Sequence, residues 1–280
     1  MEFSGNLFQY DTEERLNAFE TSPSSDKTVV FIGGLGDGFN AVPFLAPLYK
    51  SISALGWSLT QVQLSSSVGG FGTSNLQTDC KELDTLVEYL KSKRQKKQIV
   101  FIGHSTGSQD CYWHNKNGKH SQDISGYILQ APCSDRQYLA SLENYQYLVD
   151  LSTKMKNDGN GQEIMPRKAH WSPITGDRFY SLAAKFGDDD VFSTDFTDEE
   201  IKKLFEGVDR PLVWVYGEKD EYYPPSNGNP QESIDKYMRL VPAIKEGHIV
   251  PNADHCITDK EAQQAFCKIV SDYLISIEKD

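Results

Sequence analysis

The sequence predicts an α/β fold: a mostly parallel central sheet flanked by helices, with a helical cap insertion. Six short runs rich in β-branched residues recur along the chain, and amphipathic helical patterns separate them. This alternation is typical of parallel strands whose connecting helices cover both faces of a sheet. The strand pattern stops between Ser134 and Arg210. We therefore expect a single domain over residues 1–280, with a cap inserted at about residues 134–210.

The spacing of apolar and capping residues predicts where the elements lie. Apolar residues recur every three or four positions over 76–90, which predicts a helix, and Ser74 with Gln77 predicts a capping box at its start. Thr258 with Glu261 predicts a second capping box, at the start of a long C-terminal helix that packs on the sheet. The strands are expected at residues 28–32, 59–64, 98–102, 126–130, 212–216 and 248–250.

The interval without strands has helical signals of its own. Apolar residues between Tyr138 and Leu148 have helical spacing, and Thr197 with Glu200 predicts a capping box. Three consecutive aspartates at 188–190 could suggest calcium binding, but the turn glycine of an EF-hand loop is missing. We expect a solvated acidic loop at this tract.

Composition and charge narrow the classes of function. The chain has 28 Lys+Arg against 40 Asp+Glu, and the resulting net charge of −12 argues against nucleic-acid binding. No apolar run approaches the roughly 18 residues of a membrane helix, and the first residues lack the features of a secretory signal. The five cysteines are widely spaced and form no CxxC pair, which favours buried, reduced thiols in a cytoplasmic protein over disulfides or a zinc site.

The segment Gly103–Gly107 matches the G-x-S-x-G pattern of a nucleophile elbow and directly follows an expected strand. In such an elbow a sharp turn between strand and helix exposes the serine oxygen at the carboxyl edge of the sheet. Ser105 is therefore the candidate nucleophile. The alternative is a plain glycine turn that Ser105 caps. His104 adjoins the serine but is expected to be a packing residue, because its side chain leaves the turn in another direction.

A serine nucleophile needs a histidine base and a carboxylate that fixes the tautomer of this base, in the chain order Ser, acid, His. Asp220 follows the strand expected at 212–216 and is the candidate acid, with Glu218 and Glu221 as competitors and a structural turn as its other possible role. His255 is the candidate base because it lies in a loop, whereas His248 begins an apolar strand.

An oxyanion hole would complete the site, with one amide from the residue after the nucleophile and one from the loop after an early strand. Thr106 supplies the first amide. The glycine-rich segment Gly33–Gly38 follows the strand expected at 28–32, and the amide of Leu35 is placed to supply the second. A phosphate or dinucleotide site is the alternative for this loop, but G-K-[ST] and the third-glycine spacing of G-x-G-x-x-G are both missing.

Together these segments resemble the α/β-hydrolase superfamily and, within it, the fungal and plant proteins grouped as DUF1749 or UPF0613. The likeness covers roughly residues 4–275, although Gly33 and Gly34 stand where many broader hydrolases have His-Gly. This family includes fungal siderophore esterases that cut ester bonds in fusarinine-type hydroxamate siderophores, so the resemblance implies chemistry of that kind. The similar stretches are 31–38, 64–67, 70–74, 103–107, 109–111, 129–132, 134–136 and 187–190.

We predict a serine esterase that acts through an acyl-enzyme on a small-molecule ester. Ser105 attacks the carbonyl, His255 takes its proton and Asp220 orients His255. The amides of Leu35 and Thr106 hold the oxyanion. No metal or organic cofactor is expected. Two alternatives remain: an acyl-thioesterase or lipase-like enzyme with the same triad, and a non-catalytic ligand-binding protein of the same fold.

Overall fold

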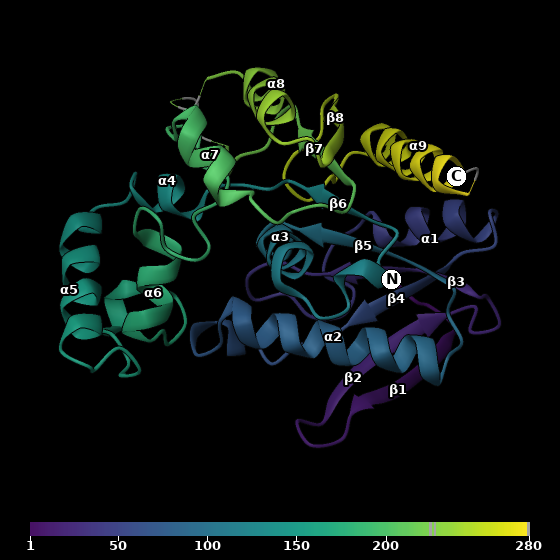
Figure 1. Ribbon diagram of the computed structural model, residues 1–280, viewed down its shortest axis with the longest axis horizontal. Helices are drawn as coiled ribbons and strands as arrows, with labels where there is room; N and C mark the ends of the chain where they lie inside the picture. The colour runs from purple at the N-terminus through teal and green to yellow at the C-terminus, as the bar shows by residue number, and fades with distance from the viewer. Residues whose placement is uncertain (224–225, 227, 279–280) are drawn as a thin grey trace.

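The computed structural model describes residues 1–223, 226 and 228–278, which form an eight-stranded mixed sheet with helices on both faces (Figure 1). The strand order is β1-β2-β4-β3-β5-β6-β7-β8. The strands are β1 (Gly5–Asp11), β2 (Leu16–Thr21), β3 (Lys27–Ile32), β4 (Ser58–Val62), β5 (Gln98–His104), β6 (Gly126–Gln130), β7 (Leu212–Gly217) and β8 (Ile244–Val250).

The sheet is parallel from β4 through β8 and antiparallel where β1 pairs with β2 and β2 with β4. The carboxyl ends of β3, β5, β7 and β8 therefore meet at one edge of the sheet, the place where sheets of this kind bind ligands. All six expected strands are present. The hairpin of β1 and β2 was not expected, and β8 begins at Ile244 rather than at His248.

Helices on opposite faces of the sheet bury alternate residues of each strand. Figure 1 shows α2 and α3 on one side of the sheet and α1 and α9 on the other. In β3, Val30 and Ile32 pack with α2 and α3, whereas Val29 and Phe31 pack with α1 and α9. These helices, with α8 on the side of α2, are α1 (Leu45–Ser53), α2 (Leu76–Ser92), α3 (Gly107–Asn117), α8 (Pro230–Leu240) and α9 (Lys260–Ile277).

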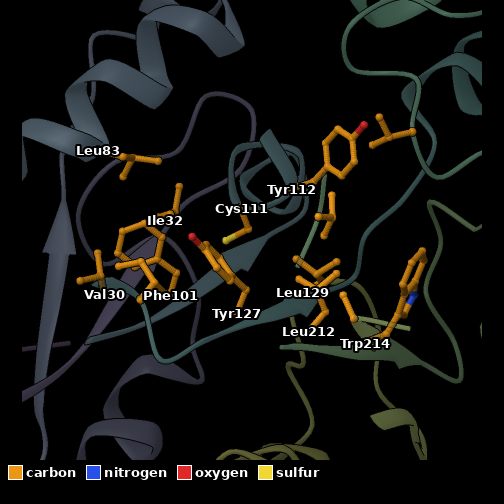
Figure 2. Packing of buried hydrophobic residues seen from close by; sticks show 14 of the residues in the cluster. Val30, Ile32, Leu83, Phe101, Cys111, Tyr112, Tyr127, Leu129, Leu212 and Trp214 are labelled. Atoms are coloured by element: carbon orange, nitrogen blue, oxygen red, sulfur yellow. The ribbon is translucent and has the colours of Figure 1, made fainter. Parts of the chain in front are cut away.

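Figure 2 shows how the first of these two core layers is filled. Phe101 of β5 and Tyr127 of β6 lie beneath Leu83 of α2 and Cys111 of α3, while Trp214 of β7 extends the layer toward the other end of the sheet. Each of these side chains is entirely buried. Four of the five cysteines are buried and all five are free thiols, as expected.

The segment between β6 and β7 is helical and contributes no strand to the sheet over residues 134–210. Figure 1 shows α4, α5 and α6 standing beyond the sheet at the left of the view. An isolated bridge between Ile164 and Thr175 closes the loop that joins α5 to α6. The helices of this segment are α4 (Asp135–Leu139), α5 (Tyr145–Asn157), α6 (Gly176–Ala183) and α7 (Asp198–Leu204).

One of the three expected capping boxes is confirmed and two are wrong by one residue. Thr197 and Glu200 form the capping box of α7. The N-cap of α2 is Asn75, whose side chain accepts from the amide of Thr78, rather than Ser74. The N-cap of α9 is likewise Asp259 rather than Thr258, because the Asp259 carboxylate accepts the amides at the start of the helix.

The expectation of a solvated acidic loop at residues 188–190 is wrong for two of its three aspartates. Asp189 and Asp190 are each only 1% exposed. Arg178 Nη1 donates to Asp189 Oδ2 at 2.5 Å, and Arg136 Nε donates to Asp190 Oδ2 at 2.8 Å. Buried carboxylates require such partners. Asp189 and Asp190 therefore form buried ion pairs with arginines of the inserted segment.

Arg178 also joins the inserted segment to the helices on the sheet. It belongs to a group of charged side chains that we call the acid–arginine cluster, which consists of Asp79 of α2, Asp110 of α3, Arg178 of α6 and Asp189. The Arg178 Nε donates to the carbonyl of Phe71 at 3.0 Å. Burial raises the pKa of Asp79 to about 7 and that of Asp110 well above its usual range, and the two carboxyl groups share a hydrogen bond. This pair therefore retains a proton near neutral pH.

None of the helices in the described ranges combines the length and the apolar character needed to cross a bilayer.

Candidate active site

Ser105 lies on a sharp turn between β5 and α3. Its φ is +54°, in the left-handed region that non-glycine residues rarely adopt. A Cβ on Gly103 would lie 2.1 Å from the carbonyl oxygen of Gly107, and a Cβ on Gly34 would lie 2.7 Å from the Cβ of Ser105. Glycine is therefore required both before the serine in the turn and in the facing loop after β3. The expected strained elbow is the conformation that these residues adopt.

Asp220 and His255 are brought together from the loops after β7 and β8. Nδ1 of His255 lies 2.9 Å from Oδ1 and 3.0 Å from Oδ2 of Asp220. His255 is 4% exposed and Asp220 is 6% exposed. Oδ1 of Asp220 also accepts the amide of Tyr222 at 2.9 Å, so this aspartate both forms a turn and contacts the histidine. This contact leaves Nε2 of His255 as the ring nitrogen not engaged by Asp220.

Gln130, which the sequence analysis did not identify, ties the serine turn to the histidine loop. Its backbone carbonyl accepts the amide of Ser105 at 2.9 Å, and its side-chain Nε2 donates to the carbonyl of His255 at 3.1 Å. Its Oε1 contacts Nδ1 of His104. One residue at the end of β6 therefore holds both loops, the serine turn through its backbone carbonyl and the histidine loop through its side chain. Only its position at the end of an expected strand could have indicated this.

The competing residues of the sequence analysis lie near the site but make other contacts. Glu221 accepts the backbone amide of His255 at 3.0 Å, and Glu218 accepts the amide of Asn252 at 2.8 Å. His248 Nε2 lies 2.9 Å from a Glu246 oxygen. Neither the other two acids nor the other histidine forms a His–carboxylate pair beside Ser105.

His104 packs in the core, as expected, with its ring 5.0 Å from that of His255. Burial lowers the pKa of His104 to about 3, so its ring is neutral at neutral pH. A neutral imidazole in this position does not repel a proton on His255 as a charged one would.

The loop after β3 passes close to the serine turn, because a Cβ on Gly34 would lie 3.3 Å from Ser105 Oγ, and Leu35 follows Gly34 in this loop. Within the described ranges, neither the amide of Leu35 nor that of Thr106 donates a hydrogen bond to the protein. Asp37 supports the loop: its Oδ2 accepts the amide of Gly34 at 2.7 Å, and its own amide donates to the carbonyl of Gly34 at 3.0 Å. Burial raises the pKa of the Asp37 carboxyl. This support was not predicted from the sequence, although Asp37 lies inside the glycine-rich segment.

A cavity of about 550 Å³ opens onto Ser105 and His255. Its remaining walls come from the loop of Leu35, from the loops after β7 and β8, and from the inserted segment, including α4. The apolar side chains that the insertion contributes are Leu139, Leu142, Ala169, Trp171 and Leu182. This volume is that of a small-molecule site. No group of three or more His, Cys, Asp or Glu side chains suited to a metal ion occurs in the part of the chain that the structure describes.

Comparison with known proteins places this geometry in a family. The chain matches the family described as "Protein of unknown function (DUF1749)" over residues 1–277. A UPF0613 protein of Schizosaccharomyces pombe is 27% identical over 99% of this chain and 95% of its own length. The fusarinine C esterase of Aspergillus fumigatus is 28% identical over 89% of this chain and 88% of its own length.

Solved structures show the same fold. A siderophore hydrolase from Aspergillus fumigatus superimposes with a TM-score of 0.82 at 24% identity, covering 100% of this chain and 99% of that one. An α/β-hydrolase-fold protein of unknown function superimposes with a TM-score of 0.75 at 17% identity, covering 100% and 98% respectively. The fold is thus that of the α/β-hydrolases. Because the family match spans nearly the whole sequence, this chain belongs to the DUF1749 family.

Proposed function

We propose that this protein is a serine esterase that cleaves carboxylic esters through an acyl-enzyme. The chain is a carboxylic ester hydrolase in which Ser105 is the nucleophile, His255 the general base and Asp220 the residue that orients His255. The observation that carries the proposal is the bond between His255 Nδ1 and the Asp220 carboxylate, next to a serine on a positive-φ turn and open to one cavity.

In the first half-reaction, Ser105 Oγ forms a bond to the ester carbonyl carbon as its proton passes to Nε2 of His255. Asp220 accepts from Nδ1 and stabilises the resulting imidazolium. The amides of Leu35 and Thr106 donate to the oxyanion, where one such donor contributes about 10²–10³ in kcat. The intermediate then expels the alcohol, which takes the proton from His255.

In the second half-reaction, His255 takes a proton from a water molecule, whose oxygen attacks the acyl carbon. The second tetrahedral intermediate collapses, Ser105 recovers its proton from His255 and the acid leaves. This chemistry moves only protons and the acyl group, so no metal or organic cofactor takes part in the proposed cycle.

Residues 134–210 are proposed to act as a cap that selects the substrate within the single domain. Support comes from Trp171, which lines the cavity and lies so close to the loop of Leu35 that a Cβ on Gly36 would come within 3.0 Å of its ring. The substrate is proposed to be a hydroxamate siderophore ester of the fusarinine type, because one compared protein is named a fusarinine C esterase and another a siderophore hydrolase. The five free thiols support a cytoplasmic location.

An acyl-thioesterase or lipase-like activity is the second candidate, and the apolar side chains on the cap side of the cavity favour it. The same triad would serve an acyl group of another kind. A panel of fusarinine-type esters, short-chain and long-chain glycerol esters and acyl thioesters, assayed under one set of conditions, ranks these substrates by kcat/KM. A preference of tenfold or more for the thioesters or long-chain esters would replace the siderophore assignment.

Covalent labelling by a fluorophosphonate, measured by intact mass, tests the serine mechanism. We expect one adduct per chain for the wild type and none for Ser105→Ala. His255→Ala should slow labelling by at least about 10²-fold, because the serine loses its base. The matched control His248→Ala removes a histidine outside the cavity and should label normally. A folded wild type that takes no label would favour the non-catalytic ligand-binding protein.

A further inference from the structure

Four charged side chains line the cavity, and three of them have a clear local role. Asp37 accepts the amide of Gly34, and Glu221 accepts the amide of His255. The ammonium group of Lys168 lies over the ring of Tyr147, 4.9 Å from its centre. The fourth side chain is Asp135, at the first position of α4.

Asp135 has a neutral hydrogen-bond donor rather than a cationic partner. Its Oδ2 accepts from Nε2 of Gln109 at 2.7 Å, and the same nitrogen lies 3.4 Å from the carbonyl of Cys133. Gln109 lies in the first turns of α3, four residues after the nucleophile. Asp135 is half-buried and lines the same cavity as Ser105.

The surroundings of Asp135 do not favour a lone negative charge. Burial and the nearby Asp189 carboxylate raise the pKa of Asp135 to about 7, even though Arg178 and His255 act in the opposite direction. Arg178 is committed to Asp189, which it contacts directly. A carboxylate with this environment gains most from a cation that enters the cavity with the ligand, because the ion pair offsets the cost of burial.

We infer that Asp135 binds a protonated amine of the substrate, so that the enzyme prefers esters carrying an ammonium group a few bonds from the scissile carbonyl. The inference rests on the proposed esterase function and adds a chemical class to it. The ammonium group would donate to the carboxylate of Asp135 while the ester carbonyl occupies the site beside Ser105. Apolar side chains of the cap would contact the rest of the molecule.

A purely structural role for Asp135 makes a different prediction. The carboxylate at the start of α4 could serve only to hold Gln109 and so join the serine helix to the loop after β6. Asp135→Asn separates the two roles, since the Asn oxygen still accepts from Gln109 but carries no charge. A structural role predicts equal effects on charged and neutral esters. A binding role predicts a loss for the charged esters alone.

The test compares isosteric pairs of esters that differ in one charge. The first pair carries it in the acyl part, as ethyl 4-aminobutanoate and ethyl pentanoate. The second pair carries it in the alcohol, as 3-(dimethylamino)propyl butanoate and 4-methylpentyl butanoate. We expect the wild type to prefer the cationic ester in at least one pair. Asp135→Asn should lower kcat/KM for that cationic ester by about 10–100-fold, the usual effect of losing a charge-assisted hydrogen bond. Neutral esters should change less than twofold.

The control variant is Asp150→Asn, because Asp150 on α5 also accepts from a glutamine amide, at 2.9 Å, but lies outside the cavity. It should leave both members of each pair unchanged. Equal losses for charged and neutral esters in Asp135→Asn, or a wild type without preference in both pairs, would overturn the inference while leaving the esterase intact. If no ester is cleaved and Ser105 takes no label, the proposed function itself fails.

A measurement on the wild type alone covers the case in which Asp135→Asn does not fold. n-Butylammonium chloride should inhibit hydrolysis of ethyl pentanoate competitively, whereas potassium chloride at the same ionic strength should not. Equal effects of the two salts would contradict an ammonium site in the cavity.

Discussion

Two buried polar clusters lie close together in this molecule and are built in opposite ways. The pair of Asp220 and His255 comes from two loops at the carboxyl edge of the sheet, and one side of the histidine faces the cavity. The acid–arginine cluster comes from helices α2, α3 and α6 and the residues after α6, and its members are each at least 93% buried. The first cluster is open to a ligand and the second is closed.

This difference predicts which property each cluster controls. Loops that meet at a strand edge can lose a polar side chain without losing a helix contact, so changes there should reduce activity more than stability. A closed cluster that joins elements distant in the sequence should affect the free energy of unfolding first. Variants that violate this division would show that the two clusters act as one unit.

Asp220→Asn should produce the largest effect. Loss of the carboxylate removes the group that orients His255 and stabilises its imidazolium, and we expect kcat to fall by about 10³–10⁴-fold. The melting temperature should change little in comparison. Steady-state kinetics and thermal unfolding of the same preparation measure both quantities. Glu218→Gln, in the same loop but bonded to Asn252, is the matched control and should keep its activity.

Arg178→Met should produce the opposite outcome. It removes the cation that faces Asp189 and leaves buried carboxyl groups without it, which typically costs about 3–5 kcal/mol of folding free energy. Chemical denaturation measures this loss. The folded fraction at low temperature should retain kcat within a few-fold. An unchanged denaturation midpoint, or a kcat loss as large as that of Asp220→Asn, would show that the two clusters do not control stability and activity separately.

Asp37 lies between the two cases, because it is half-buried and supports the loop of the proposed oxyanion hole. Asp37→Ala should lower kcat by about 10-fold with KM nearly unchanged, since a displaced amide donor affects the transition state more than the bound ester. Asp37→Asn keeps an acceptor for the Gly34 amide and should recover most of the rate. If both variants lose the same activity, the charge of Asp37 matters rather than the hydrogen bond.

The open cluster was easier to anticipate from the sequence than the closed one. Ser105, Asp220 and His255 each follow a strongly patterned strand, and parallel strands bring their carboxyl ends to one edge whatever lies between them in the sequence. The acid–arginine cluster has no comparable signal. Asp189 resembles a solvated residue in the sequence because Arg178, which neutralises it, lies eleven positions away in a segment without strand periodicity.

Local ambiguity explains the smaller errors. Asn75 and Asp259 directly follow Ser74 and Thr258, and all four are good N-cap residues, so spacing alone does not separate them. The hairpin of β1 and β2 was not predicted because its residues face solvent on one side, and Leu7 is 66% exposed. Periodicity detects buried parallel strands more readily than a half-exposed antiparallel edge.

The smallest expected effect concerns the proton held by Asp79 in the closed cluster. The folded-state pKa of Asp79 is raised from 3.8 to about 7, so this group favours folding at acidic pH and its contribution is lost as the pH rises through 7. Asp79→Asn replaces the protonated carboxyl with a neutral donor. We expect a gain of about 2–4 °C in melting temperature at pH 8, which corresponds to roughly 1 kcal/mol in a chain of this size, and a smaller gain at pH 5.

The matched control for this pH dependence is Asp195→Asn, for which the sign is reversed. The guanidinium of Arg136 lowers the pKa of Asp195, so that carboxylate stabilises the fold at neutral pH and loses its contribution as the pH falls through its folded-state value. Asp195→Asn should therefore destabilise at pH 8 and have less effect at pH 3. If Asp79→Asn behaves like Asp195→Asn, Asp79 is ionised at neutral pH, and the closed cluster is held by charge pairs alone rather than by a shared proton.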